Sequence, residues 1–97
     1  SFFAPDMEKF PALNLAYESL RKGGNMACIM NAANEAAVDA FLKEQIGFYD
    51  ITDVVQECMG GADFVGSPDL ETIFETNDAA FAHAKEIIGK VSSAKTF

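Results

Sequence analysis

The segment Asn31–Leu42, which reads NAANEAAVDAFL, decides the fold of this 97-residue chain. Wound at 3.6 residues per turn, it places apolar side chains on most of its circumference rather than on one stripe. A helix of this kind is usually covered on most sides, and its five alanines allow neighbouring helices to approach closely. We therefore predict a central helix from Met26 to Glu44, with the rest of the chain wrapped around it.

The polar residues of this helix form one group, because Asn31, Asn34 and Glu35 share a face. Two amides and a carboxylate could bind an ion or a hydroxyl group, but without a nearby histidine they make a poor transition-metal site. The alternative, which we favour, is that they satisfy buried backbone groups or contact a neighbouring loop or a partner domain.

On the N-terminal side, Phe10-Pro11 predicts the start of a helix, since proline is favoured at the first helical position. This helix is expected to end at Gly23-Gly24, where glycine adopts the left-handed conformation without steric cost. Its apolar residues recur at i, i+3, i+4 and i+7, so we expect them to face the core. They are Leu13, Ala16, Tyr17 and Leu20.

Two more helical patterns follow the central helix. Asp50 is a suitable N-cap for a helix that ends at Gly60-Gly61, and the apolar residues 46–49 before it are expected to pack on the core. Ser67-Pro68 predicts the start of a broken helix, whose short first part is followed by a restart at Thr76 or Asn77 into its long last part. The core stripe of that last helix consists of Ala80, Phe81, Ala84, Ile87, Ile88 and Val91. The predicted fold class is all-α: a small antiparallel four-helix bundle-like domain with an extended N-terminal arm.

Charge and cysteine usage exclude several classes of function. Fifteen acidic against seven basic residues give a net charge of −8, which repels phosphate backbones and anionic lipid, so we expect neither a nucleic-acid nor a membrane partner. Cys28 and Cys58 lack metal-ligand spacing and fall on helical apolar faces, where free cysteine behaves as a small hydrophobe. We therefore expect a reducing, cytoplasmic compartment.

Catalytic motifs are missing from the chain. His83 is the single histidine and is expected to be a solvated surface residue. Ser67 is not surrounded by a nucleophile-elbow motif, and the two glycine pairs lack the spacing of phosphate-binding loops. Judged on its chemistry, the segment is not an enzyme.

A series of landmarks is more specific than this chemistry. In order they are Pro5-Asp6, Phe10-Pro11, Leu15-Ala16, Gly24, the NAANE run at 31–35, Ala37-Val38, Ala40 to Leu42, Ile46, Phe48 and Asp50-Ile51. With these landmarks the chain resembles the C-terminal helical domain of the 1-deoxy-D-xylulose 5-phosphate reductoisomerase family. The resemblance is strongest from Ala4 to about Ile51.

This resemblance implies a longer enzyme of the non-mevalonate isoprenoid pathway. Such an enzyme uses NADPH and a divalent cation, Mg²⁺ or Mn²⁺, to convert 1-deoxy-D-xylulose 5-phosphate into 2-C-methyl-D-erythritol 4-phosphate. In the family, a glycine-rich turn binds NADPH and a central domain holds the metal and the substrate. We carry over no catalytic, cofactor-binding or metal-binding residue from those motifs to this chain.

Residues 1–97 are therefore expected to form the C-terminal domain, a fragment of a longer enzyme, and to be inactive alone. The resemblance implies packing against the catalytic and NADPH-binding domains of the same chain, in a homodimeric enzyme of the bacterial cytoplasm. Candidate residues for the inter-domain contact are Phe2, Phe3, Asn31, Asn34 and Glu35. The alternative is a free-standing acidic helical module that binds another protein.

Overall fold

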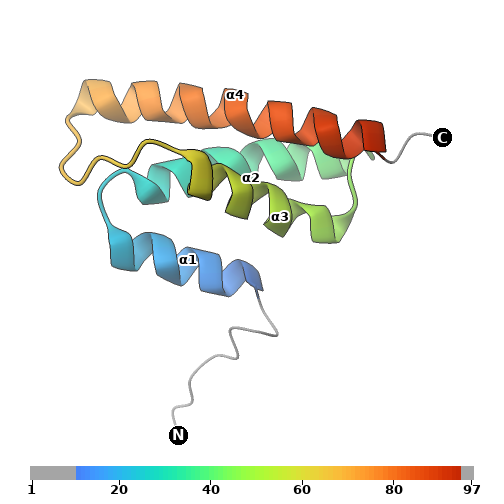
Figure 1. The fold of residues 1–97 in the computed structure, drawn as a ribbon, viewed down its shortest axis with the longest axis horizontal. Helices are drawn as coiled ribbons and strands as arrows, with labels where there is room; N and C mark the ends of the chain where they lie inside the picture. Colours follow the sequence, from blue (N-terminus) through green and yellow to red (C-terminus); the bar gives the residue numbers. More distant parts are fainter. Residues whose placement is uncertain (1–10, 95–97) are drawn as a thin grey trace, which may run out of the picture.

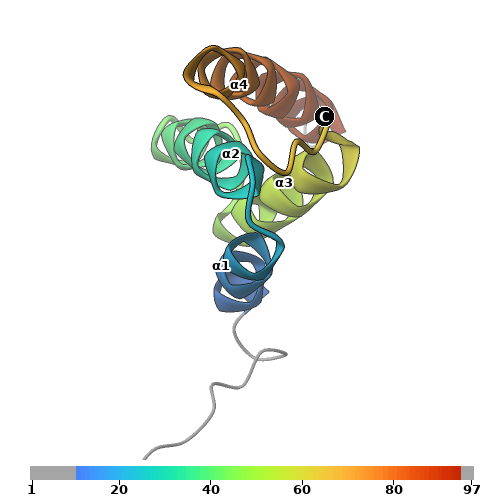
Figure 2. The same cartoon turned by 90° about the vertical axis from the view of Figure 1, so that its left-hand side faces the viewer.

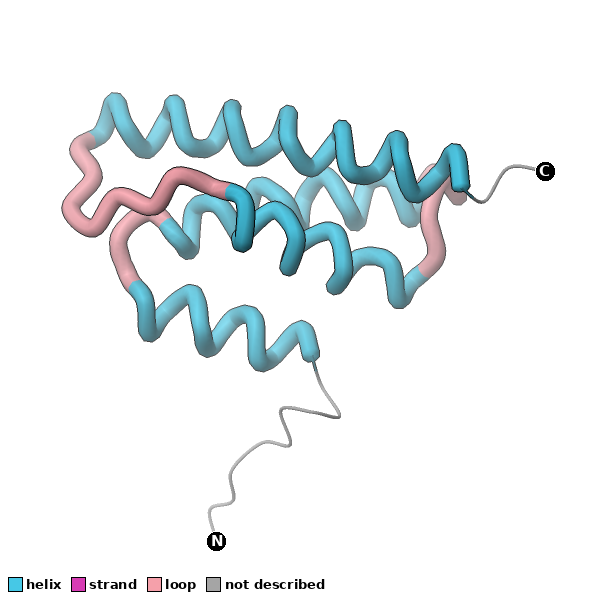
Figure 3. Tube along the Cα trace, in the orientation of Figure 1, coloured by secondary structure: helices cyan, strands magenta, loops and turns pink. Residues whose placement is uncertain are grey.

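The structure is a computed structural model that describes residues 11–94, with side chains from residue 14 onwards. It contains there four α-helices and no strand: α1 (Pro11–Lys22), α2 (Met26–Leu42), α3 (Phe48–Gly61) and α4 (Leu70–Ala94). Consecutive helices run antiparallel and are joined by short loops (Figures 1 and 3). The predicted all-α four-helix fold is confirmed, and the predicted arm of residues 1–10 lies outside the described residues.

Helix α2 is the centre of the domain, as predicted, and contacts each of the other three helices. Viewed end-on, α2, α3 and α4 form a triangle, and α1 packs below it (Figure 2). Close packing around α2 is possible because most of its buried side chains are alanines. The helix ends at Leu42 rather than at Glu44, since Glu44 has a left-handed φ of 61°. The buried residues of α2 are Met26, Ile29, Ala32, Ala33, Ala36, Ala37 and Ala40.

The rest of the core comes from α3, α4 and the loop before α3. The predicted stripe of the last helix is confirmed, with Phe81 and Val91 packed at its edges. The isoleucines and valines among these residues are larger than the alanines of α2 and fill the space that the alanines leave. The buried hydrophobic residues outside α2 are Ile46, Val54, Val55, Cys58, Ala80, Ala84, Ile87 and Ile88.

Helix α3 begins earlier than predicted, and Asp50 is not its N-cap. Gly47 holds the cap position, and Asp50 lies in the first turn. The Asp50 backbone N–H donates to Gly47 O at 3.1 Å, and the Gly47 N–H donates to Asp50 Oδ2 at 2.7 Å. The carboxylate therefore reaches back to the amide that precedes the helix, as the third residue of a capping box does.

Helix α4 is one continuous helix of 25 residues, so the predicted break at Thr76 or Asn77 is wrong. It also starts later than Ser67-Pro68 predicts, because Asp69 caps it: the Thr72 N–H donates to Asp69 Oδ1 at 2.8 Å. Threonine and asparagine are weak helix formers, but long-range packing overrides such small preferences. At Thr76 a hydrogen bond from Asn25 contributes to that packing.

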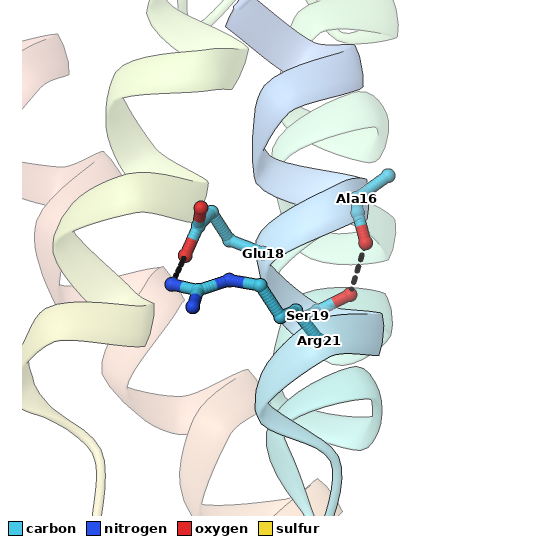
Figure 4. Close-up of polar contacts among 4 residues, drawn as sticks. All are labelled: Ala16, Glu18, Ser19 and Arg21. Carbon is cyan, nitrogen blue, oxygen red and sulfur yellow. Dashed lines mark hydrogen bonds and ion pairs between the residues drawn. The ribbon is translucent and has the colours of Figure 1, made fainter.

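The prediction that Leu13, Ala16, Tyr17 and Leu20 face the core is wrong for Tyr17 and Leu20, and the side chain of Leu13 lies outside the described part of the chain. Leu15 packs against the core and Ser19 is buried, whereas Tyr17 and Leu20 are exposed and Ala16 is half-buried. The Ser19 hydroxyl is satisfied within the helix, since it donates to Ala16 O at 2.8 Å (Figure 4). A buried serine that bonds its own backbone can face a neighbouring helix without loss of a hydrogen bond, so the apolar period does not fix the buried face here.

The α1–α2 turn contacts the α3–α4 loop through Asn25, whose side chain is 1% exposed. Its Nδ2 donates to Asp63 O at 3.0 Å and to Thr76 Oγ1 at 3.1 Å. Its Oδ1 accepts from the Val65 N–H at 2.8 Å. One buried amide therefore joins three segments that are distant in sequence.

Candidate inter-domain surface

The predicted polar group lies on the side of α2 that none of the described helices covers. Asn31, Asn34 and Glu35 are all exposed, and no hydrogen bond joins their side chains to other groups within residues 11–94. The alternative that they satisfy buried backbone groups is therefore wrong. Val38, half-buried, and Leu42, exposed, share this side by helical spacing. We call these five residues the outer face of α2.

An aromatic cluster continues the outer face of α2 where that helix ends. Phe41 and Phe48 meet edge to face with ring centroids 5.8 Å apart, and Phe48 and Tyr49 do so at 5.6 Å. Phe48 is 65% exposed and Tyr49 is 87% exposed, so of the apolar residues 46–49 only Ile46 packs in the core as predicted. These rings, together with Leu42, present apolar surface next to the exposed amides of α2.

A groove of about 500 Å³ separates the first half of α4 from the α3–α4 loop. His83 forms part of its wall and is half-buried, so it is less exposed than a histidine on a fully solvated helix surface. A Cβ atom added to Gly61 would lie 3.0 Å from His83 Cε1, so the glycine gives the ring its room. The groove is lined by Ile29, Gly61, Ala62, Asp63, Val65, Thr72, Glu75, Thr76, Ala79, Ala80 and His83.

The residues do not fit a metal centre in the part of the chain that the structure describes. No three histidine, cysteine, aspartate or glutamate side chains there come together as a ligand set would. Two triplets in the sequence, Asp6–Glu8 and Asp69–Glu71, place two carboxylates at Asp-x-Glu spacing. Asp69 of the second triplet caps α4, and the first, Asp6–Glu8, lies outside the described residues.

Both cysteines behave as predicted from their apolar positions. Cys58 is buried and its thiol donates to Ala80 O at 3.4 Å, while Cys28 is half-buried with Sγ 3.6 Å from Ile73 O. Burial raises the pKa of both thiols, which keeps them protonated and unreactive at neutral pH. Neither thiol has the lowered pKa of an activated nucleophile.

The remaining candidate residues, Phe2 and Phe3, lie outside the described residues. Sequence reasoning missed Asn25, because nothing in the local pattern distinguishes a buried asparagine from an exposed one. It also missed the aromatic cluster. Consecutive Phe48-Tyr49 at the first turn of a helix would have indicated it, since neighbouring helical residues cannot both face one core.

Among residues 11–94, no helix is long and apolar enough to cross a membrane.

Comparison with known proteins identifies the family of this chain. The family model described as the DXP reductoisomerase C-terminal domain matches residues 1–83. The 1-deoxy-D-xylulose 5-phosphate reductoisomerase of Halothermothrix orenii is 47% identical over 90 residues, and that of Bacteroides fragilis is 44% identical over 90 residues. In both, the match covers 93% of this chain and 23% of the relative.

A solved structure agrees with this placement. The 1-deoxy-D-xylulose 5-phosphate reductoisomerase from Zymomonas mobilis, solved in complex with NADPH, superposes with a TM-score of 0.80 at 43% identity. The superposition covers 91% of this chain and 23% of that one, so this chain spans about a quarter of the relatives' length. The chain belongs to the DXP reductoisomerase C-terminal domain family.

Proposed function

We propose that the chain is the C-terminal supporting domain of a 1-deoxy-D-xylulose 5-phosphate reductoisomerase. One observation carries the proposal: relatives of that name are 44–47% identical over nearly the whole chain, yet the match covers only 23% of their length. The whole enzyme would isomerise and reduce 1-deoxy-D-xylulose 5-phosphate to 2-C-methyl-D-erythritol 4-phosphate with NADPH.

The supporting role rests on the chemistry of the described residues. Burial raises the pKa of both thiols, and the ring of His83 lies close to Gly61. The described acidic side chains do not come together as a set of metal ligands. We therefore assign no catalytic, cofactor or metal residue to this chain. NADPH and a divalent cation, Mg²⁺ or Mn²⁺, would bind to other parts of the enzyme.

The outer face of α2 is the surface that we assign to packing on the catalytic domain. Its exposed polar residues Asn31, Asn34 and Glu35 lie beside apolar Leu42 and the aromatic cluster. Interfaces between protein units commonly combine an apolar centre, rich in aromatic side chains, with a polar rim that forms hydrogen bonds. Phe2 and Phe3 belong to the same proposed contact. The proposal also includes a homodimeric enzyme in the bacterial cytoplasm.

The mass of the native polypeptide tests this proposal. An antiserum against residues 11–94 should detect in the source cells one band of about four times the mass of this chain, since the chain spans 23% of its relatives. The protein captured by that antiserum should oxidise NADPH when 1-deoxy-D-xylulose 5-phosphate is added. A native band of about 10.5 kDa would instead favour the free-standing acidic interaction module.

A further inference from the structure

Helix α1 presents two of its large apolar side chains, Tyr17 and Leu20, to solvent. Leu20 is 76% exposed and Tyr17 is 54% exposed, with half-buried Ala16 at the edge of the same stripe. We call these three residues the outer stripe of α1. Toward α2 the helix presents Leu15 and Ser19 instead. An apolar stripe that recurs at helical spacing is usually a packing surface, and this stripe has no cover within the described residues.

The surroundings of the stripe restrict what can cover it. Helix α1 contacts α2 and α3 but not α4, so it lies at the edge of the domain (Figure 2). The outer stripe itself carries no charge, and Glu18 and Arg21 beside it neutralise each other through a 2.8 Å ion pair (Figure 4). A covering surface therefore needs to be apolar rather than oppositely charged.

The position of α1 in the chain indicates where the covering surface comes from. Pro11 begins the first described helix, so polypeptide that precedes residue 1 approaches the domain through α1. In the relatives, about three-quarters of the length lies outside the match, and the matching family is a C-terminal domain. That length therefore lies on the N-terminal side of α1. A second copy of this chain is a poorer partner, because each copy carries a net charge of −8.

We propose that the outer stripe of α1 docks against polypeptide that precedes residue 1 in the full-length enzyme. This inference rests on the proposed function and adds a second contact to it, on a different helix from the outer face of α2. The contact would join the two units at the point where the chain passes from one to the other.

Photo-crosslinking in the full-length enzyme tests the proposal. Tyr17 is replaced by p-benzoyl-phenylalanine, which keeps an aromatic side chain at that position, and crosslinked peptides are identified by mass spectrometry. We expect a crosslink within one polypeptide, from residue 17 to a peptide that precedes residue 1. The matched control carries the same amino acid at Lys90, on the exposed side of α4, and should give at least tenfold less of this product.

Three results would overturn the proposal. One is a product of doubled polypeptide mass, which would assign the stripe to a second copy. Another is a crosslink that stays within residues 1–97. The third is a yield at position 17 no higher than at position 90. All three results are obtained with a full-length enzyme. Failure of the proposed function is seen in a different measurement, as a native polypeptide no longer than this chain.

A Leu20→Gln variant of the full-length enzyme gives an independent reading. Leucine and glutamine have similar helix propensities, so the change costs little at a position that stays in water. We expect a melting temperature several degrees lower than that of the parent enzyme, because the position is covered there. A melting temperature within one degree of the parent would contradict the docking.

Discussion

Asn25 and Val65, forty residues apart, are joined by two hydrogen bonds. The Asn25 backbone N–H donates to Val65 O at 3.0 Å, and the Val65 N–H donates to Asn25 Oδ1 at 2.8 Å. Asn25 thus pairs with both the N–H and the C=O of Val65, as a residue of a neighbouring strand would. Because Asn25 Nδ2 also bonds Asp63 and Thr76, the end of the bundle where α2 begins depends on one side chain.

We predict that Asn25→Ala destabilises the chain by about 3 kcal/mol, because it leaves buried donors and acceptors without partners. Urea unfolding followed by far-UV circular dichroism measures the change. Asn77→Ala is the matched control: Asn77 is exposed on α4, so its free energy of unfolding should change by less than about 0.5 kcal/mol. Equal unfolding midpoints for the two variants would show that the Asn25 bonds contribute nothing.

Gly24 and Gly23 provide a second matched pair. Both have left-handed φ values, 56° and 71°, so alanine should cost about 1–2 kcal/mol at either position. At Gly24 the new Cβ would also collide with Val65 O, whereas at Gly23 no heavy atom lies within 4 Å. We predict that Gly24→Ala destabilises the chain by about 2 kcal/mol more than Gly23→Ala does. Identical costs would mean that the α1–α2 turn does not contact the α3–α4 loop this closely.

The lowered pKa of Asp69 predicts that the folded chain loses stability in acid. Hydrogen bonds from Thr72, first from its side chain and then from its backbone amide, hold the pKa of the Asp69 carboxyl below 3.8. A carboxyl whose pKa is depressed by folding stabilises the fold above its unfolded pKa, and this contribution disappears as the pH falls through the folded pKa.

Asp69→Asn keeps an oxygen acceptor at the cap but does not titrate. Between about pH 5 and about pH 2, the parent chain should therefore lose more stability than this variant does. Parallel stability curves for the two proteins over that range would refute the assignment of Asp69 as the cap of α4.

Much of the fold could be predicted from helical periodicity and from helix-ending residues. The period located α2 and the stripe of α4, and Pro11 with Gly23-Gly24 bounded α1 correctly. These predictions succeed because the burial of an apolar face and the backbone preferences of proline and glycine act locally. Asp50 was misplaced by one turn because acidic residues are favoured both at the N-cap and in the first turn.

The failures arise where the deciding contact is distant in sequence. A break was expected at Thr76, but Asn25, 51 residues earlier, bonds its hydroxyl inside a continuous helix. For α1 the apolar period was read correctly, but the face toward α2 is set by Leu15 and Ser19. If Tyr17 and Leu20 pack on another unit of the enzyme, their apolar spacing and their exposure in this structure are both explained. The exposure of Asn31, Asn34 and Glu35 follows from their spacing, whereas the surface that we propose they contact does not.

The central claim is that this domain supports an active site without supplying a reacting group to it. Steady-state kinetics of the full-length enzyme carrying Asn31→Ala, Asn34→Ala and Glu35→Ala together test that claim most directly. We predict a kcat at 25 °C within about threefold of the parent enzyme and a melting temperature several degrees lower, since the triple change weakens packing between domains. A kcat reduced by about 100-fold or more at an unchanged melting temperature would contradict the claim, because losses of that size are typical of removed catalytic groups.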